Sequence, residues 1–261
     1  IQNHYLPLPS TLFDKMNREI LDSASLLNDA GRCFCFKALT FDSMNITAND
    51  IITFCKLEYG TEVCAIPNAV NIFYLEGCTA SDMLPNQDLP DIWNDTCLII
   101  QANQGPGWAM HRMEATSEPG LSATMSKQAA KLGGVFRIAI GFHAEKWVMG
   151  FHKRNKQHPA LVQSGKIFGH RDKNRDGKRT GDLVTDNVTG LNQHGTRAGL
   201  KSVRVGEWSY ACLVRRMWED HLKFIRLCKN DPRYILDNGF KFSTTVVDYS
   251  EFWKWKAAQP A

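Results

Sequence analysis

The feature that most constrains the fold of this 261-residue chain is a series of short apolar runs separated by turn-forming residues. From Val63 onward, runs rich in β-branched and aromatic residues alternate with Gly, Pro, Asn and Asp, which is typical of antiparallel β-structure. The sequence therefore predicts an α+β fold that is mainly β. We expect strands at 70–75, 96–101, 135–142, 147–152, 160–163 and 244–248.

Three segments have the apolar periodicity of amphipathic helices. The first is predicted over residues 10–30, and the second runs from the capping sequence at Thr47 to about Lys56. The third is predicted from Leu213 to Cys228, which places Cys212 where a loop enters a helix. Its buried stripe comprises Val214, Met217, His221, Phe224, Ile225 and Cys228.

The eight cysteines are unevenly distributed, since six lie in the first 97 residues and only Cys212 and Cys228 follow. Along one helix those last two would lie about 24 Å apart at 1.5 Å per residue, which is beyond disulfide reach. We therefore expect both to be free thiols and the six others to form three disulfides. The spacing of the first two does not match a C-x-x-C zinc or redox motif. The six are Cys33, Cys35, Cys55, Cys64, Cys78 and Cys97.

An even number of cysteines and three glycosylation sequons favour a secreted glycoprotein of eukaryotic origin. The sequons begin at Asn45, Asn94 and Asn187. The chain starts at Ile1 without a charged and apolar leader, so we expect any signal peptide to have been removed. No apolar run approaches the ~20 residues that cross a bilayer, and no membrane span is expected.

Charge divides the chain into an acidic and a basic part. Residues 1–100 contain 5 Lys and Arg against 13 Asp and Glu, whereas residues 101–261 contain 26 against 14. The basic part favours an anionic partner such as a cell-wall polymer, and we do not expect nucleic acid. The alternative is an ordinary solvated surface.

Thiol chemistry is indicated by His194, which precedes Cys212 by 18 residues. A cysteine at a helix N-terminus meets amide groups and a positive dipole, which lower the pKa of its thiol. A histidine folded beside it can act as its base, and consecutive amides can form an oxyanion hole. The alternative is a buried, inert thiol.

An ordered set of short motifs covers about residues 70–250 and resembles the L,D-transpeptidase (YkuD-type) catalytic domain. The resemblance is closer still to uncharacterised phage and proteobacterial YkuD-like proteins. The matching pieces are 73–77, 93–95, 114–120, 150–152, 159–163, 170–177, 179–182, 190–194 and 208–212.

This resemblance implies a β-sandwich or barrel over residues 63–252, with a helix after the catalytic cysteine. A disulfide-rich helical extension (1–62) precedes it, and a tail (253–261) follows it. Cys212 would be the nucleophile and His194 its base. The amides of Tyr210, Ala211 and Cys212 would form the oxyanion hole, with Ser209 bracing the turn. Substrate would contact His152, Gln163 and Gly195.

Two positions depart from the family motif. Ala211 stands where the motif has Gly, which removes freedom at a tight turn. Val214 stands where the motif often has Arg, and Arg215 lies one residue further along. Both departures bear on activity more than on the fold.

The segment after His170 resembles the start of an EF-hand calcium loop, with oxygen ligands at positions 1, 3 and 5 and Gly177 at position 6. The bidentate Glu of position 12 is missing, because Leu183 stands there. We expect a structural Ca²⁺, with a charged turn that binds nothing as the alternative. The ligand set would be Asp172, Asn174, Asp176, Lys178, Thr180 and Asp182.

Three functions remain open at this point. The first is a secreted enzyme that transfers or hydrolyses acyl groups of peptide or peptidoglycan-like substrates through a Cys212 thioester. The second is a binding protein that retains the scaffold without the chemistry, which Ala211 and Val214 favour. The third is a recruited secreted enzyme with unrelated small-molecule chemistry, possible examples being oxidative and luciferase-like.

Overall fold

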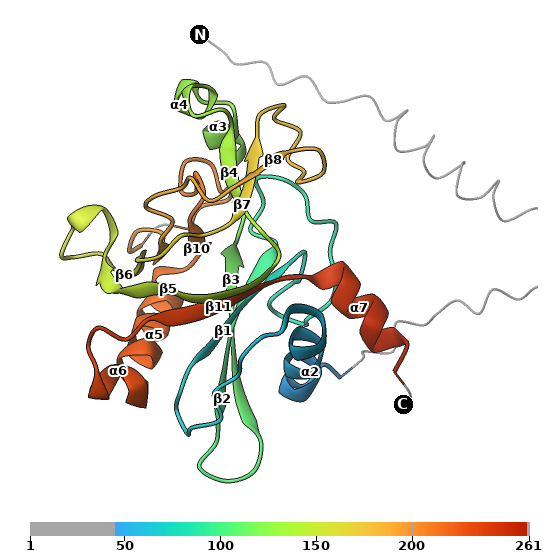
Figure 1. Ribbon diagram of the computed structural model, residues 1–261, viewed down its shortest axis with the longest axis vertical. Helices are drawn as coiled ribbons and strands as arrows, with labels where there is room; N and C mark the ends of the chain where they lie inside the picture. The colour runs from blue at the N-terminus through green and yellow to red at the C-terminus, as the bar shows by residue number, and fades with distance from the viewer. Residues whose placement is uncertain (1–44, 200, 260–261) are drawn as a thin grey trace, which may run out of the picture. The chain divides into compact units, whose positions relative to one another are not determined.

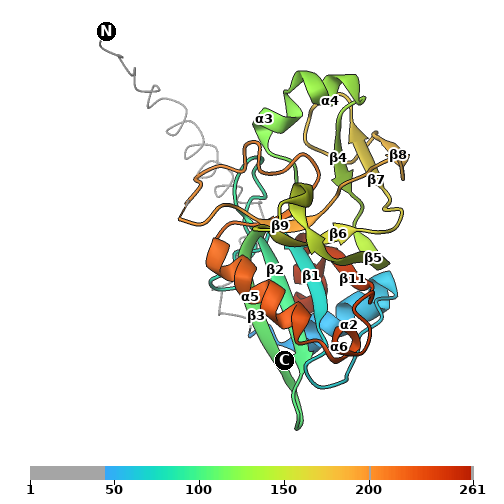
Figure 2. The same ribbon diagram turned by 90° about the vertical axis from the view of Figure 1, so that its left-hand side faces the viewer.

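The computed structural model describes residues 45–199 and 201–259, of which residues from Ile46 onward form one compact unit. The helix predicted over 10–30, together with Cys33 and Cys35, lies outside the described residues. Figures 1 and 2 show the described unit from two directions.

Eight strands close into a barrel in the order β1-β11-β5-β6-β9-β10-β3-β2 (Figure 1). Two neighbouring pairs, β1 with β11 and β9 with β10, are parallel, and the other pairs are antiparallel. The prediction of a mainly β fold with helices is thus confirmed. The strands are β1 (Asn71–Glu76), β2 (Asp95–Ala102), β3 (Trp108–Thr116), β5 (Gly141–Phe151), β6 (Pro159–Gln163), β9 (Gln193–Gly195), β10 (Leu213–Arg215) and β11 (Phe242–Asp248).

The barrel is filled by apolar side chains that alternate along its strands, because successive residues of a strand face opposite sides. Trp147 is the largest fully buried apolar side chain, and its indole N–H donates to the carbonyl of Leu191 at 2.9 Å. Tyr74 of β1 and Leu161 of β6 belong to the same core. The Trp147 hydrogen bond therefore attaches the segment that leads into β9 to the core of the barrel.

A second, three-stranded sheet lies at one end of the barrel in the order β4-β7-β8, beside two short helices (Figures 1 and 2). The run predicted as one strand over 135–142 is divided between this sheet and the barrel, because the chain leaves β4 at Ile138 and enters β5 at Gly141. The elements are β4 (Val135–Ile138), β7 (Gly169–Asp172), β8 (Leu183–Thr185), α3 (Leu121–Thr124) and α4 (Lys127–Lys131).

Buried charges connect this small sheet to the barrel. Arg179 donates to both carboxylate oxygens of Glu76, at 2.8 and 2.5 Å. The Ser117 hydroxyl lies 2.9 Å from Glu76 Oε1 and 2.7 Å from Asp95 Oδ2. Burial raises the pKa of Asp95 to about 8, and the negative charges of Asp88 and Glu76 add to the effect. Asp95 is therefore mainly a neutral acid near pH 7.

Two helices pack together on one flank of the barrel, α2 (Ala48–Tyr59) and α7 (Tyr249–Ala257) (Figure 1). The Phe54 ring lies 5.5 Å from the rings of both Phe252 and Trp255, and Lys256 pairs with Asp50 at 2.8 Å. The helix predicted from Thr47 is confirmed, with a capping box between Thr47 and Asp50. Parts of the expected extension and tail thus pack within the compact unit that begins at Ile46.

The helix predicted from Leu213 is wrong at its start. Residues 213–215 form β10, and helix α5 spans Trp218–Lys229, followed by α6 (Pro232–Leu236). The buried stripe is retained only from His221 to Cys228. The reason is tertiary: β10 pairs with β9 on one side and β3 on the other, and this pairing closes the barrel. Cys212 consequently precedes a strand and has no helix dipole behind it.

No disulfide joins cysteines in the part of the chain that the structure describes. Cys55, Cys78, Cys97 and Cys228 are buried free thiols, whereas Cys64 and Cys212 are half-buried free thiols. The expected bridges within residues 33–97 therefore stay a prediction. Among the described helices, none is long and apolar enough to cross a membrane.

Candidate functional site: a histidine pocket beside Cys212

The parallel pairing of β9 with β10 brings His194 and Cys212 to neighbouring strands. Val214 is the register partner of His194, and Leu213 is the partner of Gln193. Residues two apart on an extended chain face the same side, so Cys212 and Val214 share the side on which His194 lies. No hydrogen bond joins His194 to Cys212 among the described residues.

The thiol of Cys212 is held by the loop that enters β9. The N–H of Asn192 donates to Cys212 Sγ at 3.5 Å, and the thiol donates to the carbonyl of Gly190 at 3.5 Å. Burial raises the pKa of this thiol to about 11, an effect that the Asn192 amide only partly offsets. Cys212 is thus a protonated thiol at neutral pH, which corrects the thiolate expected from a helix N-terminus.

The turn before Cys212 is braced at both ends. Ser209 is fully buried, and its hydroxyl donates to the carbonyl of Cys212 at 2.8 Å. Tyr210 packs against the small apolar cluster of α3, α4 and β4. Ala211 is not among the described residues with a positive φ, so this backbone conformation does not require glycine. No hydrogen bond donated by the amides of residues 210–212 is found in the described part of the chain.

His194 has a fixed tautomer. Its Nδ1 lies 2.8 Å from the carbonyl of Gly195, and because a carbonyl can only accept, Nδ1 carries the proton. Its Nε2 is therefore a free base, and that atom is buried without a hydrogen-bond partner in the described structure. Burial lowers the pKa of His194 well below the usual value, so the ring is neutral.

Two more imidazoles contact the His194 ring. The His152 ring stacks on it at a centroid distance of 3.9 Å, and His158 meets it edge to face at 5.4 Å. His158 Nε2 also donates to the carbonyl of Gly195, at 3.1 Å. Burial lowers the pKa of His158, and it lowers the pKa of His152 to about 4. Among the described residues, no group of three or more His, Cys, Asp or Glu side chains is arranged so that it could hold a metal ion.

Behind this cluster lies a buried cation. Arg215 is fully buried on β10, and its Nε donates to His221 Nδ1 at 3.1 Å, while His221 Nε2 donates to the carbonyl of Pro159 at 2.7 Å. The guanidinium lies 3.8 Å from the centre of the Phe224 ring. No ion pair to Arg215 is found among the described residues. Its positive charge therefore adds to burial in keeping His221 neutral.

The histidines open into a pocket of about 680 Å³. Trp208 lines this pocket and also packs against the small cluster of Trp93, Val205 and Val214 that contacts Cys212. Cys212 itself does not line this pocket; it packs, like Trp208, against that cluster. Its lining residues are His152, Lys153, Asn155, His158, His194, Arg197, Glu207 and Trp208.

The three residues expected to contact substrate have different positions. His152 lines the pocket, and Gly195 supplies the carbonyl that orients His194. Gln163 does not line it, because its amide is used within the chain: it donates to the carbonyls of Gly165 and Val188, and accepts from the amide of Leu191. Gln163 therefore braces the loop that leads into β9.

Sequence analysis missed His158 and assigned His221 only to a buried stripe. His158 follows His152 across a short β5–β6 connection, and a hairpin of that length brings its two ends together. That spacing was the available signal for His158. For His221 there was none, because its partner Arg215 comes from a strand that sequence reasoning placed in a helix.

The calcium-type loop is closed by its first aspartate. The fully buried Asp172 accepts the amides of Asp176 and Gly177, each at 3.1 Å. Burial and the neighbouring charges of Asp172 and Asp176 raise the pKa of Asp182, and one oxygen of Asp182 is buried without a partner in the described structure. A bound cation would relieve the repulsion among these carboxylates. Ca²⁺ binding in this loop stays a prediction.

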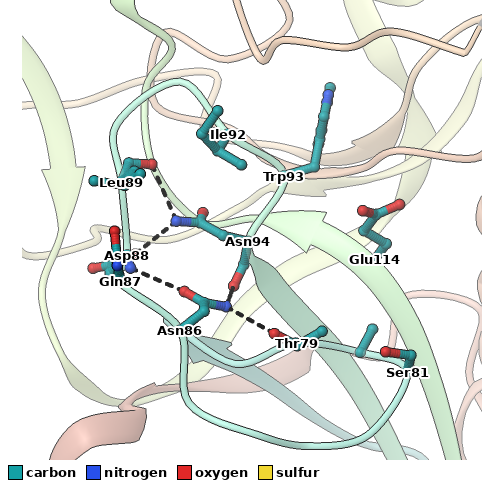
Figure 3. A pocket seen from close by; sticks show the side chains of 11 residues that line it. Thr79, Ser81, Asn86, Gln87, Asp88, Leu89, Ile92, Trp93, Asn94 and Glu114 are labelled. Carbon is teal, nitrogen blue, oxygen red and sulfur yellow. Dashed lines mark hydrogen bonds between the residues drawn. The ribbon is translucent and has the colours of Figure 1, made fainter. Parts of the chain in front are cut away.

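A second pocket, of about 590 Å³, contains one of the three sequons (Figure 3). The Asn94 side-chain nitrogen donates to the carbonyl of Leu89 at 3.1 Å and to Asp88 at 3.4 Å, as Figure 3 shows. Attachment of a glycan at that nitrogen would disrupt these contacts. Asn45 and Asn187 are exposed and carry no such constraint.

No family model, curated protein or solved structure matches this chain. The assignment of chemistry therefore depends on the residues themselves.

Proposed function

We propose that this protein is a cysteine-dependent acyltransferase or hydrolase of L,D-transpeptidase type, with Cys212 as the nucleophile and His194 as its base. The observation that carries the proposal is an unpaired basic atom, His194 Nε2, on the strand that pairs with β10, directly after Cys212. His194 Nδ1 is fixed by the Gly195 carbonyl, so Nε2 is left as a proton acceptor. A third group that orients the base is the arrangement that activated nucleophiles require.

The resting pair is neutral, which determines how the reaction would proceed. The Cys212 proton moves to His194 Nε2 as the sulfur attacks the substrate carbonyl carbon, and the carbonyl oxygen receives the unused amides of residues 210–212. The imidazolium then protonates the leaving amine as the carbon–nitrogen bond breaks, which leaves a thioester. An amine or water attacks the thioester carbon and His194 takes its proton. The carbon–sulfur bond then breaks to release the amide or acid, and the imidazolium returns its proton to the sulfur.

A binding protein on the same scaffold is the second candidate. It is favoured by the raised thiol pKa of about 11 and by the absence of a helix N-terminus at Cys212. A thiol in that environment has about one part in 10⁴ as thiolate at pH 7, so without transfer to His194 it is a weak nucleophile.

The test is covalent labelling of the whole protein with a β-lactam and with a peptide thioester, followed by intact-mass and peptide mapping. We expect one acyl adduct, on Cys212. Cys212→Ser should abolish it without unfolding the protein, because the change in volume is small. His194→Ala should slow labelling about 10²-fold or more, as expected for loss of a general base.

Two matched controls separate chemistry from folding. Cys64 is the other half-buried described thiol, and Cys64→Ser should leave labelling unchanged. His111→Ala removes a half-buried imidazole on β3, outside the pocket, and should also have no effect. A folded wild-type protein whose Cys212 stays unlabelled by both reagents would refute the enzyme and leave the binding protein.

A further inference from the structure

The histidine pocket is framed by two basic loops. Residues 152–158 contain three Lys and Arg and no acid, and residues 196–208 contain three Lys and Arg and one acid, Glu207. Each loop contributes one cation to the pocket wall, Lys153 from the first and Arg197 from the second. Charges that line one concave site add to a field that favours a ligand of opposite sign.

Both of these cations lack an internal partner. Lys153 and Arg197 are exposed, and neither donates a hydrogen bond or forms an ion pair among the described residues. Glu207 is the only acid among the described residues that line the pocket, and it also forms no ion pair there. Lys153 and Arg197 are thus two positively charged hydrogen-bond donors that remain available to a bound ligand.

The first loop holds its cation in an unusual backbone conformation. Lys153 and Arg154 have φ of 49° and 58°, in the left-handed region that residues other than glycine rarely adopt. The loop is closed by backbone hydrogen bonds from His152 to His158 and from Asn155 to His152, each at 2.9 Å. Strain of this kind persists where surrounding structure imposes it, and it concentrates at binding and catalytic sites.

A third observation points to an occupant. His194 Nε2 is buried without a partner, on a residue that lines this pocket. A buried polar atom without a hydrogen bond is costly unless a ligand or water completes it. The two unpaired cations and the unpaired imidazole nitrogen line the same pocket, so together they form a site that lacks its ligand.

We propose that the pocket takes a substrate whose acyl segment carries carboxylates, which Lys153 and Arg197 bind while His194 faces the reacting carbonyl. This inference rests on the proposed function and names its substrate class: an acidic peptide segment rather than a neutral one. Carboxylate suits the wall because the Arg197 fork pairs with two oxygens and the ammonium of Lys153 offers a point charge. Neutral imidazoles and the Trp208 indole then accommodate the uncharged part of the ligand.

Binding is measured by calorimetry on Cys212→Ala, which cannot form a thioester. The probes are the acidic peptide acetyl-Ala-Glu-Glu-Ala with a free C-terminus and the neutral acetyl-Ala-Gln-Gln-Ala amide. We expect the acidic peptide to bind at least tenfold more tightly. Its affinity should fall as ionic strength rises from 0.01 to 0.2 M, because exposed charges are screened over that range.

Charge-removing variants locate the site. In the same background, Lys153→Gln with Arg197→Gln should weaken the acidic peptide about tenfold, since each exposed pair contributes a few-fold. Arg226→Gln with Lys229→Gln removes equal charge from exposed positions on α5 outside the pocket and should have little effect. Thermal melting of each variant verifies that it is folded.

Equal affinity for the two peptides, or equal losses in the two double variants, would overturn the proposal. Tighter binding of inorganic phosphate than of the acidic peptide, measured in the same way, would overturn the assignment to carboxylate. The two proposals fail separately. Selective binding without acyl transfer in the wild-type protein refutes only the enzyme, whereas acyl transfer from neutral and acidic esters at equal rates refutes only the substrate class.

Discussion

Replacing Gly195 with alanine tests how closely His221 packs against the residue whose carbonyl orients the candidate base. A Cβ at this position would lie 2.5 Å from His221 Cβ and 2.7 Å from His221 Cγ. The φ of Gly195 is not in the left-handed region, so the substitution introduces no backbone strain of its own. Any effect of the added methyl group therefore comes from this contact.

Relieving this contact costs free energy, because His221 is not free to move away from the added methyl group. Atoms at 2.5 Å must separate by roughly 1 Å to reach ordinary van der Waals distance. His221 is held by Arg215 and by the carbonyl of Pro159, so its displacement would break hydrogen bonds of 3.1 and 2.7 Å. Overpacking of this kind costs about 1–3 kcal/mol, so we expect about 2 kcal/mol and a fall in Tm of about 4–8 °C.

The assay combines urea unfolding, thermal melting and the rate of Cys212 labelling. Gly195→Ala should lower stability and also slow labelling, because the Gly195 carbonyl orients His194. Adding His221→Gly, which removes both the Cβ and the Cγ that the new methyl group meets, should recover part of the loss, giving a coupling energy of about 1 kcal/mol or more. Gly105→Ala, where an added Cβ meets nothing within 4 Å, is the control and should change stability by less than about 0.5 kcal/mol. Wild-type stability in Gly195→Ala, or strictly additive losses in the double variant, would refute the reasoning.

Three further predictions follow from charge and exposure. Folding raises the pKa of Asp95 to about 8, so the folded state holds a proton that the unfolded state releases near pH 4. Stability from this group should therefore fall as pH rises from about 4 to about 8, and urea unfolding of Asp95→Asn should lose that slope. Ca²⁺ should raise Tm, with Asp182→Asn weakening the effect; unchanged melting with chelator would exclude the ion. Glycopeptide mapping of secreted material should find glycan at Asn45 or Asn187 and none at Asn94.

The sequence was sufficient for the parts of the fold that depend on local pattern. The α2 helix follows from a capping box at Thr47, and β1, β2 and β6 follow from apolar runs between turn residues. The three-residue strands β9 and β10 could not be recognised this way, because they are too short to show a period and exist only through pairing across the barrel. The same local periodicity led to a helix at Leu213 where the barrel required a strand.

The candidate site was predictable in part of its residues and not in its electrostatics. His194 and Cys212 were identified from order and spacing, and Ser209 from the family resemblance; His194 lies on β9, and the other two lie in the turn before β10. The pKa values could not be anticipated, because they depend on burial and on His152, which reaches His194 from another hairpin. The charge states of His194 and Cys212 depend on residues that approach them only in the folded structure, and the order of residues in the sequence does not reveal these neighbours.

The parallel pairing of β1 with β11 has a consequence for the order of folding. Ile72 pairs with Thr244, so the barrel closes only after residues near the end of the described chain have been made. Pairings across such sequence separations have a large entropy cost and form slowly. The turn bearing Cys212 precedes β10, which lies in the same closed barrel on the side away from the β1–β11 pair. That barrel is complete only once β11 pairs with β1 and β5, so reactivity of that thiol should appear late in refolding, after α2 and the β2–β3 hairpin are in place. Deleting 242–248 should therefore abolish labelling although none of the removed residues lies in the pocket.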